Sequence, residues 1–134
     1  MAGQGTAALR RPTIAGLRIL LVEDEAMLGL LFSVMIESLG HVVCGVATTE
    51  TGAVQAAADL NPDLMIVDVG LGRGDGVAAM AQILALRRTP HMFISGNIAK
   101  LAARGETAVV LEKPFTEPQL MGAIDQVFRA TVGV

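Results

Sequence analysis

The sequence contains no tryptophan, no tyrosine and a single cysteine, Cys44, so no disulfide can form within the chain. It also lacks any uninterrupted apolar segment of the roughly 20 residues that a transmembrane helix needs. Its N-terminus has no apolar core of the kind found in signal peptides. These absences predict a protein that does not insert into membranes and that resides in a reducing cytoplasm.

Concentrated positive charge is missing as well. The net charge is −3, and the only adjacent basic residues are the isolated pairs Arg10-Arg11 and Arg87-Arg88. Since DNA-binding surfaces are normally strongly basic, direct binding to nucleic acid is not expected. Apolar side chains, in contrast, are abundant: 52% of the 134 residues are hydrophobic and 17% are charged. This balance is typical of one globular domain with a proper core.

Short β-branched runs alternate with helical patterns along most of the chain. Residues 1–16 show no periodicity and are expected to form a flexible tail, so the folded domain is predicted over residues 17–134. A last helix is expected at about residues 117–130, because Thr116 and Gln119 have the spacing of a capping box. The strands are predicted at Leu17–Val22, Val42–Ala47, Leu64–Val69, Met92–Ser95 and Ala108–Leu111.

Strands that are almost continuously apolar and alternate with helices are typical of a parallel sheet covered on both faces. The predicted fold class is therefore α/β, with a doubly wound five-stranded parallel sheet. No linker follows the last helix, so a stand-alone domain is expected. Methionines fall among the apolar positions, and core packing is their expected role; they include Met27, Met35, Met65, Met80, Met92 and Met121.

Polar and charged residues stand where four of the predicted strands end. Glu23-Asp24-Glu25 follows the first strand, Asp68 lies at the end of the third, Ser95 ends the fourth and Lys113-Pro114 follows the fifth. The carboxyl ends of parallel strands form one rim, and ligands bind at that rim in open α/β sheets. Taken singly, the acidic residues could be helix caps and Lys113-Pro114 a surface turn. Their joint placement predicts a shared site.

Carboxylates brought together at such a rim repel one another, by about 4 kcal/mol per close pair at an effective dielectric near 20. A hard divalent cation removes that cost, and Mg²⁺ prefers oxygen ligands and usually takes another from a phosphate. Lys113 would then neutralise one phosphoryl oxygen, and Ser95 would offer its hydroxyl to another. The Asp68 carboxylate could act as the nucleophile and form an acyl phosphate.

These motifs resemble those of the receiver domains of two-component response regulators, over nearly all of residues 17–131. The matching motifs are Leu20-Leu21-Val22-Glu23-Asp24-Glu25, Ile66-Val67-Asp68-Val69, Asp75-Gly76, Ser95-Gly96 and Lys113-Pro114-Phe115. The resemblance implies the flavodoxin-like (βα)₅ fold of CheY-type receivers. It implies that Asp68 is the phosphoacceptor, Lys113 the phosphate-binding lysine and Ser95 the switch hydroxyl. Mg²⁺ would be held by Glu23, Asp24, Asp68 and the backbone carbonyl of Gly70, and the peptide bond before Pro114 would be cis.

The sequence departs from the family pattern in three places. Val110 stands where the family commonly has an aromatic residue that swings inward on phosphorylation. The loop Gly70–Gly74 lacks the usual proline; its glycines could cradle a phosphate, but without a Gly-Lys-Ser/Thr motif a mobile loop is favoured. The segment from Ser95 to Lys113 is short, so its helix is expected to be truncated. Switching is therefore expected to involve Ser95, Gly96 and Asn97, next to Val110 and Pro114.

The resemblance implies a single-domain response regulator that takes a phosphoryl group from a histidine kinase or a histidine phosphotransfer protein. It would signal to an unknown output protein or act as a phosphate sink, with its own Mg²⁺-dependent phosphorylation and dephosphorylation chemistry. Two alternatives stay open. A phosphatase or phosphotransferase of the haloacid dehalogenase type would have a second Asp where this chain has Gly70. A receiver-like interaction module would never be phosphorylated, which the complete set of Asp, Glu, Ser and Lys residues disfavours.

Overall fold

Strands and helices alternate through most of the chain. The computed structural model describes residues 14–106 and 108–132. The strands of the main sheet are β1 (Arg18–Val22), β2 (Val42–Ala47), β3 (Leu64–Asp68), β6 (His91–Ser95) and β7 (Val110–Glu112). The helices are α2 (Ala26–Ser38), α3 (Glu50–Leu60), α4 (Gly76–Leu86), α5 (Ile98–Ala103) and α6 (Glu117–Val132). The five strands are parallel in the order β2-β1-β3-β6-β7, which confirms the predicted doubly wound fold.

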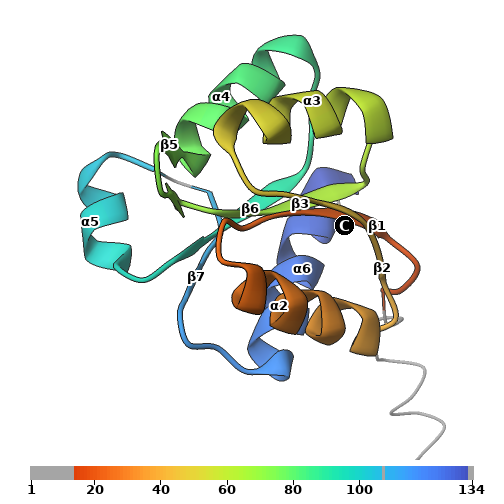
Figure 1. The fold of residues 1–134 in the computed structure, drawn as a ribbon. Helices are drawn as coiled ribbons and strands as arrows, with labels where there is room; N and C mark the ends of the chain where they lie inside the picture. Colours follow the sequence, from red (N-terminus) through yellow and green to blue (C-terminus); the bar gives the residue numbers. More distant parts are fainter. Residues whose placement is uncertain (1–13, 107, 133–134) are drawn as a thin grey trace, which may run out of the picture.

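Helices cover both faces of this sheet (Figure 1). α2 and α6 lie on one face, and α3 and α4 lie on the other. Successive side chains of a strand point to opposite faces, so the continuously apolar β1 and β3 supply two cores at once. Ile19, Leu21 and Ile66 pack with α2 and α6, whereas Leu20 and Met65 pack with α3 and α4. This double burial fixes where the carboxyl ends of the strands lie, and with them the site.

The structure differs from the predicted strands in two places: β7 starts later than expected, and an additional small hairpin follows β3. β7 begins at Val110 rather than at Ala108, because the backbone bends at Ala108, where the Ala108 N–H donates a hydrogen bond to the Glu106 carboxylate at 3.0 Å. The loop after β3 forms a small antiparallel hairpin, β4 (Gly70–Leu71) with β5 (Gly74–Asp75). Its turn needs a positive φ of 58° at Gly72, a conformation that glycine adopts without strain.

α5 is short, as predicted, with six residues. The Asn97 side chain caps its start by accepting a hydrogen bond from the Lys100 N–H at 3.0 Å, and Gly105 follows its end with a φ of 80°. The capping box of α6 is also present, since Thr116 and Gln119 exchange hydrogen bonds of 2.8 and 3.3 Å. The Lys113-Pro114 peptide bond is cis.

Some apolar residues lie on the surface. The core role predicted for methionine is wrong for Met27 and Met121, which are 78% and 45% exposed. Met27 lies in α2, which is apolar around most of its circumference although only one side can face the sheet, and Met121 lies on a side of α6 that faces away from the core. The predicted tail lies largely outside the described residues, but Ile14 packs against the core and the Gly16 N–H donates to the Gly40 carbonyl. No described helix is both long and apolar enough to cross a membrane.

Candidate functional site

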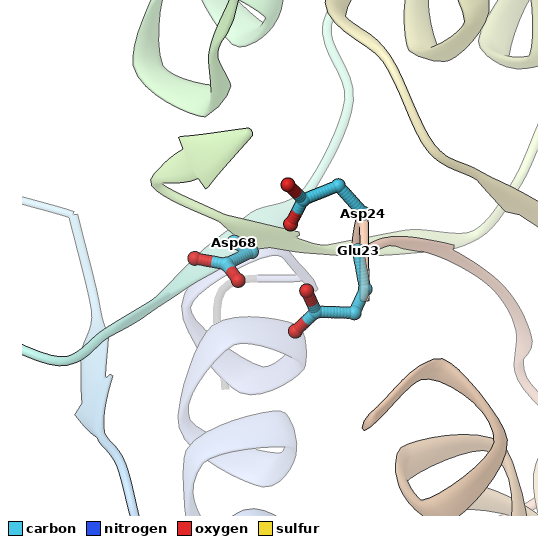
Figure 2. A group of neighbouring side chains, drawn as sticks. All are labelled: Glu23, Asp24 and Asp68. Atoms are coloured by element: carbon cyan, nitrogen blue, oxygen red, sulfur yellow. The ribbon is translucent and has the colours of Figure 1, made fainter. Parts of the chain in front are cut away.

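Three carboxylates meet at the carboxyl ends of β1 and β3, which are neighbouring parallel strands. Figure 2 shows the side chains of Glu23, Asp24 and Asp68 turned toward a common space. One carboxylate oxygen from each residue lies within 4.8 Å of the other two. Glu23 and Asp68 are only 1% and 5% exposed, whereas Asp24 is exposed. The structure therefore brings together the acidic residues that the sequence placed at one rim.

Lys113 reaches the same place from the loop after β7. Its Nζ donates hydrogen bonds to Asp68 Oδ2 at 2.7 Å and to Glu23 Oε1 at 3.2 Å. The ammonium also lies 5.9 Å from the centre of the Phe32 ring, which itself stacks on Phe115 at 5.0 Å. A single ammonium thus serves two buried carboxylates while aromatic packing limits where it can move.

The site is electrostatically incomplete, since three carboxylates face one ammonium. The pKa of Glu23 is raised from 4.5 to about 7, mainly by burial and also by the nearby Asp68, whereas the hydrogen bond from the Glu25 N–H and the Lys113 charge lower it. Burial alone would lower the pKa of Lys113, but the hydrogen bond to Asp68 and the charges of Asp68 and Glu23 raise it above its ordinary value. The pocket therefore favours additional positive charge.

Two glycines lie against Asp68, and the backbone there explains one of them, Gly76. The Gly70 N–H donates to Asp68 Oδ1 at 3.0 Å, which fixes the carboxylate at the end of β3. At Gly76, an added Cβ would lie 2.1 Å from the Asp68 carbonyl oxygen and 2.8 Å from a Val67 methyl carbon. Real Cβ atoms are never that close to backbone, so α4 can begin against β3 only with glycine at this position. Gly76 is thus a packing requirement of β3, the strand that carries Asp68.

Ser95 and the residues after it line a cavity of about 480 Å³ together with Asp68, Gly70 and Lys113. The Ser95 hydroxyl accepts a hydrogen bond from the Asn97 N–H at 3.0 Å, and its carbonyl accepts one from the Lys113 N–H at 2.9 Å. Gly96 and Asn97 line the cavity as well. Val110 and Pro114 are not among its lining residues: Val110 lies in β7 and packs against the core on the α3 and α4 side.

Sequence reasoning assigned no part in the site to three charged residues that line this cavity, namely Asp75, Lys100 and Arg104. Asp75 Oδ1 caps α4 by accepting from the Val77 N–H at 2.8 Å, and Asp75 Oδ2 pairs with Arg104 Nη2 at 2.6 Å. Asp75 was recognised only as part of a motif. Lys100 and Arg104 stand four residues apart after Ser95, a spacing that places both on one side of a helix and could have identified them.

The donor set fits a hard divalent cation. Glu23, Asp24 and Asp68 offer only carboxylate oxygens, which Mg²⁺ prefers, and the pocket carries an excess of negative charge. Gly70 lies beside the Asp68 carboxylate, so its carbonyl stays a predicted ligand. When bound, Mg²⁺ would offset the repulsion among the carboxylates and the charge of a phosphoryl group.

Comparison with known proteins agrees with this geometry. Residues 19–125 match the response regulator receiver domain family. The phyllosphere-induced regulator PhyR of Methylorubrum extorquens is 33% identical over 112 residues, which are 81% of this chain and 42% of that protein. This chain thus spans less than half the length of that relative.

Solved structures give the same result. The receiver domain of Erythrobacter litoralis PhyR superposes with a TM-score of 0.77 at 28% identity, over 84% of this chain and 90% of that domain. The anti-anti-sigma factor PhyR of Bartonella quintana gives a TM-score of 0.83 at 27% identity, over 98% of this chain and 54% of that protein. By sequence and by fold, the chain belongs to the response regulator receiver domain family.

Proposed function

We propose that this chain accepts a phosphoryl group on Asp68 from a histidine kinase or a histidine phosphotransfer protein, in a reaction that depends on Mg²⁺. The observation that carries the proposal is the position of the Asp68 carboxylate. It lies 2.7 Å from the Lys113 ammonium, next to two further carboxylates, and lines a cavity open to a donor. Membership of the receiver domain family supports the same conclusion.

The residues of the site would divide the chemistry among them. An Asp68 carboxylate oxygen forms the new bond to phosphorus while the bond from phosphorus to the donor breaks. Lys113 is already hydrogen-bonded to Asp68 and would donate to a phosphoryl oxygen after transfer. A hydroxyl can donate and accept at once, so Ser95 can keep its bond from the Asn97 N–H and donate to a second phosphoryl oxygen. Glu23, Asp24 and Asp68 would hold the Mg²⁺ ion.

We propose that the product is a signal or a phosphate drain rather than a released metabolite. The Bartonella quintana relative is an anti-anti-sigma factor, which supports an output through contact with another protein. A haloacid dehalogenase type of mechanism is disfavoured because Gly70 occupies the place of its second Asp, and its N–H binds Asp68 instead of delivering a proton. An unphosphorylated interaction module would gain no phosphoryl group from any donor.

Intact-mass spectrometry after incubation with acetyl phosphate and Mg²⁺ tests the proposal. We expect the parent chain to gain one phosphoryl group, and Asp68→Asn to gain none. Asp59→Asn is the matched control, since it removes one carboxylate from the exposed surface of α3. Labelling of Asp68→Asn to the level of the parent would exclude Asp68 as the phosphoacceptor. A parent chain that stays unlabelled would favour the interaction module.

A further inference from the structure

Two cations, Lys100 in α5 and Arg104 directly after the end of α5, line the same cavity as Asp68, Ser95 and Lys113. They are four residues apart, and because the backbone at Arg104 keeps helical dihedral angles, Arg104 continues the side of α5 on which Lys100 lies. The cavity, at about 480 Å³, is within the size range of small-molecule sites. The chemistry proposed for Asp68 uses Lys113 and leaves these two cations without a role.

Arg104 is held by a partner that it can leave. Its pair with Asp75 is short at 2.6 Å, but the two side chains are 42% and 35% exposed, so water screens the pair and it adds little to the stability of the fold. Asp75 is held in place at both its side chain and its backbone. Its carboxylate caps α4 by accepting from the Val77 N–H, and its own N–H donates to Glu50 Oε1 at 3.0 Å. Arg104 is thus the partner in this ion pair that can move. Among the described residues, the Lys100 ammonium makes no ion pair.

We propose that Lys100 and Arg104 recognise the departing carboxylate of a small acyl phosphate, so that the chain prefers acyl phosphates to phosphoramidates as free donors. This inference rests on the proposed function of Asp68. An Asp68 oxygen bonds to phosphorus as the bond from phosphorus to the acyl oxygen breaks, and the electron pair leaves on a carboxylate anion. Cations on the cavity wall stabilise that developing charge. In phosphoramidate the nitrogen carries an extra proton before transfer, so the electron pair of the breaking phosphorus–nitrogen bond stays on nitrogen and neutral ammonia leaves. These cations do not stabilise a neutral leaving group.

The ratio of phosphorylation rates with acetyl phosphate and with phosphoramidate tests this inference. Both rates are measured by intact mass at fixed Mg²⁺, pH and ionic strength. The double variant Lys100→Gln/Arg104→Gln is expected to lose about tenfold with acetyl phosphate, or about 1.4 kcal/mol of barrier, and less than about twofold with phosphoramidate. Arg104→Lys should keep most of the ratio. The control Arg87→Gln/Arg88→Gln removes two exposed charges at the opposite end of the sheet and should change neither rate selectively.

Asp75→Asn separates recognition from a merely structural ion pair. The substitution breaks the pair with Arg104, yet the introduced amide oxygen can still accept from the Val77 N–H. If Arg104 acts on the donor, Asp75→Asn frees it and the acetyl phosphate rate is kept or rises. A loss like that of the double variant, or an equal loss with both donors in the double variant, would overturn the inference. A parent chain that neither donor labels would instead overturn the proposed function.

Discussion

Raising the pH in the absence of divalent cations is expected to destabilise the folded chain through Glu23. This carboxyl is buried, and burial is the main reason that its pKa rises from 4.5 to about 7. Between those two values the folded chain keeps a proton that the unfolded chain has lost. The free energy of unfolding therefore falls as pH rises through this window, and it is level above the window.

The size of the effect follows from the shift. A rise of about 2.5 pKa units corresponds to about 3 kcal/mol at most, or a drop of about 10 °C in Tm for a domain of this size. His41 acts in the opposite direction: its burial lowers its pKa below 6.5, so its contribution to stability is lost as pH falls. The pH dependence of the parent's stability alone would therefore combine the contributions of Glu23 and His41.

Glu23→Gln isolates the carboxyl, since it keeps the shape and removes the titration. Thermal unfolding is followed by far-ultraviolet circular dichroism with EDTA present, because the chain has no Trp or Tyr for fluorescence. Between about pH 5 and 8 the parent should lose stability relative to Glu23→Gln, and Asp59→Asn should follow the parent. Added Mg²⁺ should reduce the loss at high pH, because the cation replaces the proton. Parallel profiles for the parent and Glu23→Gln would refute the account of the site.

Three further expectations concern packing, the metal and switching. Gly76→Ala should lower the free energy of unfolding by about 2–3 kcal/mol, because the added Cβ would clash with the Asp68 backbone. The control Gly122→Ala adds a Cβ in open space on α6 and should raise the free energy of unfolding by up to about 1 kcal/mol. Both are measured by urea unfolding, and equal losses in the two variants would contradict this explanation. Asp24→Ala should weaken Mg²⁺ binding in isothermal titration and slow phosphorylation together, whereas unchanged affinity would place the metal elsewhere. Hydrogen exchange of residues 96–106 should change when beryllofluoride mimics the phosphoryl group, and a change confined to Asp68 would contradict that route.

The central strands were predictable because each is a short apolar run that can be buried only in the middle of a parallel sheet. Because the carboxyl ends of parallel strands lie at one edge of a sheet, this topology alone predicts that Asp68, Lys113 and the pair Glu23-Asp24 lie close together. The surface of α2 was not predictable in the same way. Apolar residues occur on all its sides, so the sequence carries no signal for which of them, Met27 included, would face solvent.

Contacts between isolated charges were also beyond sequence reasoning. Arg104 and Asp75 are 29 positions apart, and neither lies in a repeated pattern. The start of β7 depends on a local hydrogen bond from the Ala108 N–H to the Glu106 carboxylate, which propensity does not encode. Gly76 was found as part of a motif, but its reason, the close approach of α4 to the Asp68 carbonyl, appears only in three dimensions.

The short α5 offers the most economical route from the site to a partner. Val110 supplies no ring to move, and it is already packed against the core. In α5 only Leu101 is buried, and the helix lies between Gly96, whose surroundings are open, and Gly105 with its positive φ. Such a segment has low local stability.

Three side-chain interactions hold α5 in place, namely the Asn97 cap, the buried Leu101 and the ion pair between Arg104 and Asp75. An exposed ion pair contributes only about 0–1 kcal/mol to stability. Moving an equilibrium from about 1:99 to 99:1 takes roughly 5.5 kcal/mol of preference for one state. A phosphoryl dianion on Asp68 that bonded to Ser95 and Lys113 would act on the residues from which α5 begins, and the contacts that oppose it are weak. We therefore expect α5, rather than a rotating side chain in β7, to carry the change that an output protein reads.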